Sequence, residues 1–208
     1  MSREVHTYEL FARLLEYPRT PLAAAARVCA ERVSGRSIAA ATRLLLFERV
    51  ARETELDEME ERYAAVFDLS PARTLDLGYQ LFGETYKRGV FLVKMKEAVR
   101  AHGVDAGSEL ADHLPVVLRL LAVLSSEDDP RGLVAEVILP SIEKIIRTFD
   151  DDGQGYRDVL ISLKAALMDD WGIDRVELPP CAESPLAGGG KRLPMFPGFN
   201  PPSERVLS

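Results

Sequence analysis

The sequence predicts an all-α single domain, a bundle of about eight or nine helices followed by a Pro/Gly-rich C-terminal tail. Apolar residues recur at helical spacing along most of the chain, and no stretch alternates with the period of two that a strand needs. The 208 residues are 47% hydrophobic and 28% charged, which is typical of a globular domain with a buried core. We place the helical domain at residues 1–178 and an extended or disordered tail at 179–208.

The N-terminal part is expected to form three helices. Apolar periodicity predicts the first over residues 5–17, and Pro18 ends it. The second is expected over 20–34, with Thr20 as its N-cap and a proline in its first turn. The third spans about 37–52, and its richness in leucine and alanine suggests that it lies well inside the domain.

The next segment is strongly acidic, and we expect residues 53–67 to form a helix whose charged side faces solvent. A short helix should follow from Ser70 and Pro71 to Gly83. The expected inward stripe of the acidic helix is Leu56, Met59, Tyr63, Val66 and Phe67.

A basic helix is predicted from Thr85 to about His102 in a chain that is acidic overall. Two interpretations stand: a solvated helix face, or a contact for an acidic surface of a partner. Its basic residues are Lys87, Arg88, Lys94, Lys96 and Arg100.

A compact polar cluster then runs directly into an apolar helix at residues 109–124. Pro115 is tolerated only in the first turn of a helix, and Asp112 suits the positive end of the helix dipole. The helix therefore begins between these two residues, which should place Glu109, Asp112 and His113 at the mouth of the core. The apolar stripe is Leu114, Val117, Leu118, Leu121 and Leu124.

Two more helices are expected before the tail. The first covers about 130–149 and should be kinked by Pro140. An Asp-rich loop at 150–155 lacks the ligand spacing of a calcium-binding loop. The second helix covers 156–171.

The tail carries apolar residues that either dock on the domain or a partner, or remain unstructured: Leu193, Met195, Phe196 and Phe199.

Composition restricts the partners and the compartment. The net charge of −7 argues against nucleic acid as the main partner and permits a basic peptide. Cys29 and Cys181 are far apart and form no CxxC motif, so we expect neither a disulfide framework nor a zinc site. The first residues resemble no signal peptide, and no apolar run reaches the length of a membrane span. We therefore expect a cytoplasmic protein without stable membrane insertion.

The sequence does not predict an enzyme. His6, His102 and His113 are isolated, and residues 188–191 lack the spacing and terminal Ser/Thr of a phosphate-binding loop. Asp112 and His113 are adjacent at a helix start, so their side chains do not face one another, and no nucleophile accompanies them. We accordingly expect no catalytic site, no metal and no cofactor.

A binding module fits better, because an apolar groove in a helical domain can hold an amphipathic helix of another chain. Glu109 and Asp112 would then pair with Lys or Arg of that helix, and His113 could change charge near neutral pH. In the alternative interpretation Asp112 only caps its own helix and His113 bonds locally. The alternative function is a helical scaffold or a regulatory protein-binding module.

Three segments resemble a known family. The acidic residue, Asp-His and Leu-Pro of residues 109–115 are similar to the motif of the delta-subunit chaperones of molybdenum oxidoreductases, which include nitrate reductase assembly chaperones. Residues 63–69 resemble the aromatic helix end of that family, and residues 81–89 resemble its Phe-x-x-Gly-(Asp/Glu)-x-x-x-Arg-Gly segment. The resemblance covers about 60–125, with Ala111 where the family usually carries proline.

The resemblance implies a cytoplasmic, system-specific chaperone. Such proteins bind the N-terminal segment of the apo catalytic subunit of a molybdopterin oxidoreductase and assist cofactor insertion before the complex assembles. Nitrate reductase is the commonest client, and related reductases and dehydrogenases use similar chaperones. The implied peptide contacts are Glu109, Asp112, His113, Leu114 and Pro115, followed by Tyr63, Phe67, Phe82 and Arg88.

Overall fold

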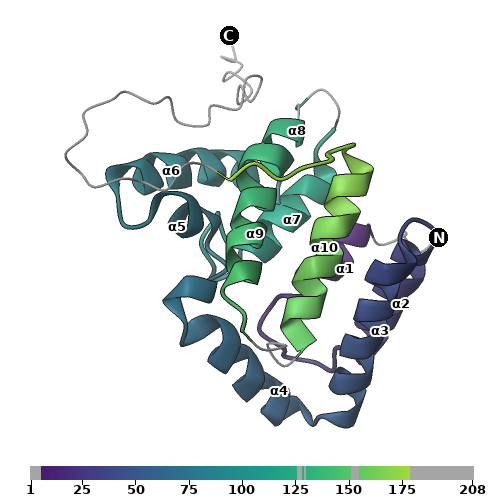
Figure 1. Cartoon of the computed structure of the whole chain (residues 1–208). Coiled ribbons are helices and arrows are strands. Elements are labelled where there is room, and N and C mark those ends of the chain that lie inside the picture. Colours follow the sequence, from purple (N-terminus) through teal and green to yellow (C-terminus); the bar gives the residue numbers. More distant parts are fainter. Residues whose placement is uncertain (1–5, 126–127, 129, 151–154, 179–208) are drawn as a thin grey trace.

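The computed structural model describes residues 6–125, 128, 130–150 and 155–178 (Figure 1). These residues form helices and connecting segments without any strand, so the prediction of an all-α fold is confirmed. Three regions singled out in the sequence lie outside the described residues: most of the Asp-rich loop (151–154), Cys181 and the C-terminal tail (179–208).

The first half of the described chain contains five α-helices and two shorter helical turns. The α-helices are α1 (Thr7–Leu14), α2 (Ala23–Ser34), α3 (Ile38–Glu53), α4 (Leu56–Tyr63) and α5 (Leu77–Phe82). The turns are the π-helical η1 (Ala64–Asp68), which continues α4, and the 3-10 turn η2 (Pro71–Arg73).

The second half contains two long helices, a composite helix and the last helix of the domain. They are α6 (Tyr86–Ala101), α7 (Leu114–Val123), the composite of α8 (Pro130–Gly132), π-helical η4 (Leu133–Ile138) and α9 (Leu139–Arg147), and α10 (Tyr156–Asp170). In Figure 1, α10 lies between α9 and the α2–α3 pair, with α1 behind it, and α5 and α6 form the opposite end of the domain.

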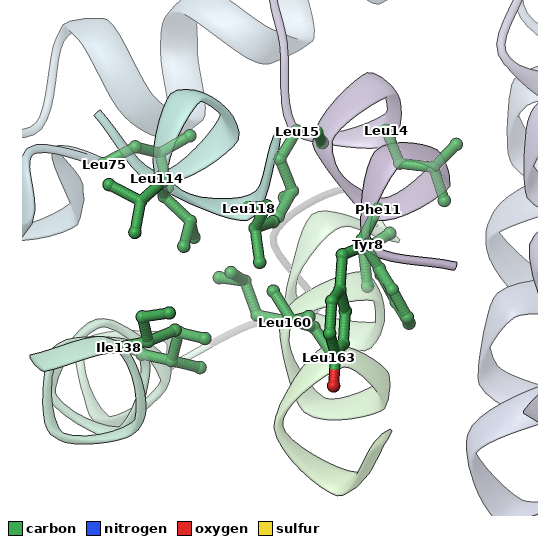
Figure 2. Packing of buried hydrophobic residues seen from close by; sticks show 14 of the residues in the cluster. Tyr8, Phe11, Leu14, Leu15, Leu75, Leu114, Leu118, Ile138, Leu160 and Leu163 are labelled. Atoms are coloured by element: carbon green, nitrogen blue, oxygen red, sulfur yellow. The ribbon is translucent and has the colours of Figure 1, made fainter. Parts of the chain in front are cut away.

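Side chains from both halves of the chain meet in one core (Figure 2). Phe11 of α1 and Leu15, which follows this helix, pack with Leu118 of α7, and Leu160 and Leu163 of α10 approach them from below in this view. Burial of these side chains supplies the main stabilising term of the fold. The helix predicted at 109–124 thus lies at the centre of the domain, and it is buried around most of its circumference.

Two predictions for the N-terminal helices are wrong. Thr20 does not cap α2, because the helix begins only at Ala23, and the Thr20 Oγ1 accepts a hydrogen bond from Arg13 Nη2 at 3.1 Å. Helix α3 does not lie well inside, since Ile38 is 79% exposed and Leu45 is 49% exposed. Only its alanine-rich face with Leu44 and Phe47 is buried, so composition alone overstated its burial.

The irregularity predicted at Pro140 takes the form of a change in helix type. The π-helical η4 ends where α9 begins, and Pro140 lies in the first turn of α9. Proline has no N–H to donate to the preceding turn, so an α-helical hydrogen bond is lost at this point. The π-helical turn carries the chain through this position as one continuous helical segment.

A short antiparallel backbone contact joins residues 75–77 to residues 112–114. The Leu77 N–H donates to the Asp112 carbonyl at 3.0 Å, and the Leu114 N–H donates to the Leu75 carbonyl at 2.9 Å. This pairing explains why the single helix predicted from Pro71 to Gly83 is interrupted. Residues 74–76 are extended, and α5 begins only at Leu77.

Leu118→Ala should lower the free energy of unfolding by about 2–5 kcal/mol, because it leaves a cavity at a fully buried position of α7. Leu69→Ala removes the same atoms from a side chain that is 80% exposed, and should change it by less than about 0.5 kcal/mol. Urea unfolding of both variants measures the difference. Equal losses would contradict the central place of Leu118.

Candidate functional site

An open groove of about 1150 Å³ crosses one face of the domain. One wall is formed by α1 and the segment that follows it, through Glu16 and residues 17–20. The other wall is the loop at residues 102–109, hereafter the rim loop, and Arg119 of α7 also lines the groove. The rim loop is mostly exposed, and Gly103 and Gly107 in it adopt positive φ angles of 64° and 59°. The groove is therefore bounded by a helix on one side and by an exposed loop on the other.

Tyr63 lines one part of the groove and ties it to the core. Its hydroxyl donates to the Leu15 carbonyl at 3.2 Å, and its ring lies 5.6 Å from that of Tyr17 and 5.1 Å from that of Phe67. Burial raises the pKa of the Tyr63 phenol, so the side chain stays neutral and keeps this hydrogen bond at physiological pH. Edge and tilted contacts of this kind favour a rigid aromatic cluster.

Two carboxylates, Asp68 and Glu109, act on the same part of the groove. Burial and the charge of Glu109 raise the pKa of Asp68, and His113 opposes this effect. Within the described part of the chain, neither carboxylate forms an ion pair. We call Asp68, Glu109 and His113 the acidic corner. Asp68 was missed in the sequence, although it directly follows Phe67 in one of the three family segments.

The His113 side chain contacts the carboxylate of Asp76. The His113 Nδ1 lies 3.2 Å from Asp76 Oδ1, and Arg88 Nη2 donates to the other oxygen of the same carboxylate at 3.1 Å. Arg88 comes from α6 and also lies over the Tyr79 ring, 5.4 Å from its centre. Asp76 thus connects the basic helix to a residue that lines the groove. No local sequence pattern indicates this role of Asp76, because only the pairing of residues 75–77 with 112–114 brings it there.

Asp112 is not at the mouth of the core, as predicted, and it does not cap its own helix. Its side chain is fully buried, and Oδ2 accepts a hydrogen bond from the Gly78 N–H at 2.9 Å. Gly78 is the second residue of α5, so the carboxylate caps α5. Burial and the Asp76 charge raise the pKa of Asp112, while the Gly78 N–H and Arg88 oppose this. Oδ1 has no hydrogen-bond partner among the described residues.

Gly78 is present because there is no room for a side chain. A Cβ atom at this position would lie 2.6 Å from Asp112 Oδ2 and 2.9 Å from the Phe91 ring. The close approach lets the carboxylate reach the α5 backbone. This glycine was also missed in the sequence, where it resembles an ordinary helix residue.

The predicted site residues separate into two groups. Tyr63, Glu109 and His113 line the groove. The others do not: Phe82 packs against Phe91 with ring centres 5.6 Å apart, and Arg88 binds Asp76. Asp112, Leu114, Pro115 and Phe67 are buried, and Tyr63 is only 3% exposed. Three of the nine predicted residues therefore share one groove, and the sequence did not separate them from the residues that are buried or bound elsewhere.

A comparison with known proteins places this geometry in a family. The family model described as nitrate reductase delta subunit matches residues 35–148, more than half of the chain and all of the predicted site residues. The chain belongs to the nitrate reductase delta subunit family. This finding agrees with the resemblance seen in the three sequence segments.

Individual relatives of this family member match over a shorter range. The nitrate reductase molybdenum cofactor assembly chaperone NarJ of Escherichia coli K12 is 34% identical over 77 residues, which are 36% of this chain. NarJ of Escherichia coli O157:H7 matches with the same values. The match spans only 33% of the length of these curated relatives.

The described residues of this delta subunit family member form neither a metal cluster nor a membrane-spanning helix. No group of three or more His, Cys, Asp or Glu side chains is placed to hold a metal ion there. In the same residues, no helix combines the length and the apolar character needed to cross a membrane. Cys29 is buried, and burial raises the pKa of its thiol to about 12.

Gly78→Ala should destabilise the protein by about 1–3 kcal/mol, because the added methyl group overlaps Asp112 and Phe91. Gly35→Ala is the matched control. Gly35 has a φ of −66° and no described atom within 4 Å of an added Cβ, so this change should be neutral or slightly stabilising. Urea unfolding compares the two variants, and an equal effect would show that the Asp112–Gly78 contact is not closely packed.

The pH dependence of stability should report on Asp112. Because its pKa is raised in the folded state, the folded protein holds the Asp112 proton more tightly than the unfolded chain does. Stability is then lost as pH rises from the ordinary carboxyl pKa of about 4 through the raised folded value. Asp112→Asn removes this titration. The free energy of unfolding of the wild type should therefore fall relative to the variant over this window, as urea unfolding at several pH values will measure. Parallel curves would contradict the raised pKa.

Proposed function

We propose that this protein is a cytoplasmic chaperone that binds the N-terminal segment of the apo catalytic subunit of a molybdopterin oxidoreductase, with nitrate reductase the first candidate. The bound subunit would be held while the molybdenum cofactor is inserted, before the complex assembles. Membership of the nitrate reductase delta subunit family carries this proposal. The relatives from Escherichia coli, named as nitrate reductase molybdenum cofactor assembly chaperones, support it.

The shape of the groove supports a peptide as the bound group. It is open along its length and lies between a helix and an exposed loop, so an extended or helical segment can enter from the side. Tyr17, whose ring packs edge-on against the buried Tyr63, provides an aromatic surface, and Val123 adds an apolar contact. These groups fit the apolar face of an amphipathic segment.

The charges of the groove suggest which segment binds. Asp68 and Glu109 can pair with Lys or Arg that flank the apolar face. Asp68 takes the role that the sequence had suggested for Asp112, whose buried carboxylate is engaged by α5. Arg119, by contrast, is already paired with Glu16 across the groove and adds no free cation.

Binding alone would be sufficient for such a function. A chaperone that binds the apo subunit lowers the concentration of the free form, which protects it from premature docking, aggregation and proteolysis. Release requires only that the segment binds less well after maturation, for example because it becomes buried in the mature subunit. The function therefore needs no catalytic group.

Asp68→Asn and Glu109→Gln should each weaken binding of the client's N-terminal peptide about two- to fivefold, because each removes one charge that faces a peptide cation at a partly exposed site. The loss should disappear when Lys and Arg of the peptide are replaced by Gln. Isothermal titration calorimetry of the full chain with both peptides measures these effects.

Glu61→Gln is the control, since this exposed carboxylate of α4 lies outside the groove lining and should leave affinity unchanged. A wild-type protein that binds neither peptide would reject the chaperone proposal and favour the helical scaffold. Equal losses for all three variants would show a general charge effect, which does not require the acidic corner.

A further inference from the structure

We propose that Asp76 is a positioning residue that fixes the His113 ring, so that His113 offers a hydrogen-bond acceptor to the segment bound in the groove. The proposal begins with the contact between His113 Nδ1 and Asp76 Oδ1 at 3.2 Å. An ionised carboxylate can only accept, so this contact is a hydrogen bond only when Nδ1 carries the hydrogen. In the neutral ring, Nε2 is then the acceptor, and it is the atom left for a group in the groove.

The surroundings of Asp76 keep this arrangement fixed. Arg88 donates to the second carboxylate oxygen at 3.1 Å, and this contact prevents the side chain from turning away. The Asp76 and His113 side chains are mostly shielded, at 24% and 13% exposure. Water therefore competes less for the hydrogen bond than it would at a fully exposed pair.

The backbone limits the movement of both residues. Asp76 and His113 lie opposite each other in the antiparallel contact, between the hydrogen bonds of Leu77 with Asp112 and of Leu114 with Leu75. The buried Asp112 carboxylate adds a third link through Gly78. The His113 ring is thus oriented by the same backbone pairing and buried carboxylate that join α5 to α7.

The arrangement defines the chemistry of the bound group. His113 Nε2 has no hydrogen-bond partner among the described residues, and His113 lies with Asp68 and Glu109. The acidic corner therefore presents hydrogen-bond acceptors to the bound group. The group that fits is rich in donors, such as a Lys or Arg side chain or unpaired backbone N–H groups at a helix start. This part of the inference rests on the proposed function. The orientation of the ring does not.

The ring can be observed directly by long-range ¹H–¹⁵N NMR of the full chain labelled at histidine. The sequence contains 3 histidines, and a His113→Gln variant assigns the signal of interest. Neutral His113 should show the Nδ1–H tautomer in the wild type. Asp76→Asn should shift it toward the Nε2–H tautomer, because an amide can also donate to Nδ1. Peptide affinity, measured by calorimetry, should fall about tenfold with the loss of one acceptor in a shielded site.

Asp105→Asn is the matched control. It removes the same charge from the rim loop, and an Asn side chain can still accept the hydrogen bond from the Gly107 N–H at 2.9 Å. The control should keep the wild-type tautomer and lose much less than tenfold in affinity. Asp76→Glu, which keeps the carboxylate, should restore the Nδ1–H tautomer.

A wild-type ring with the Nε2–H tautomer would overturn the proposal even if Asp76→Asn failed to fold, and so would an unchanged tautomer in folded Asp76→Asn. A tenfold loss that Asp105→Asn reproduces would reduce the role of Asp76 to its charge and also overturn it. If the wild type shows the expected tautomer but binds no client peptide, the proposed function fails while the positioning role holds.

Discussion

The pairing of residues 75–77 with residues 112–114 is the constraint on which the candidate site depends. It is made of two backbone hydrogen bonds and one buried carboxylate, and it connects segments separated by more than thirty residues. Without it, α5 would extend toward Pro71, and Asp76 would not face His113. A burial cost accompanies this arrangement, since Asp112 is fully buried and one of its oxygens has no partner among the described residues. Polar groups buried in this way often specify one geometry rather than add stability.

The core and the groove are built from different types of residue. Leucines and aromatic residues of α1, α7 and α10 stabilise the domain, whereas the groove is lined largely by polar and charged side chains. Tyr63 belongs to both, because its ring packs in the core while part of it borders the groove. Contacts of this kind extend the rigidity of the core to the lining of the groove.

The sequence was sufficient for the fold class and for most helices, because apolar periodicity is a local property. Within the motif that resembles the family it also singled out Glu109 and His113, which the structure places together in the groove lining. Prediction from the sequence failed where contacts between distant segments determine the position and the partner of a side chain. Asp112 resembled a cap for the helix that follows it, yet its carboxylate binds Gly78 in α5. Asp68, Asp76 and Gly78 acquire their roles only through neighbours distant in sequence, and no local pattern could identify them. Composition misled for α3, where leucine occurs on the exposed face as well as on the buried one.

The rim loop is more exposed than the paired segments 75–77 and 112–114, and this difference affects how such a protein can diversify. Its residues are mostly exposed, two of its glycines have positive φ angles, and Leu110 at its end is 46% exposed. Exposed loops tolerate insertions, deletions and changes in sequence that buried helices do not. One wall of the groove can therefore vary in length and chemistry while α7 and the buried carboxylate remain as they are. Under the proposed function, new residues in this loop would change which segment is bound, and the folded domain could stay the same.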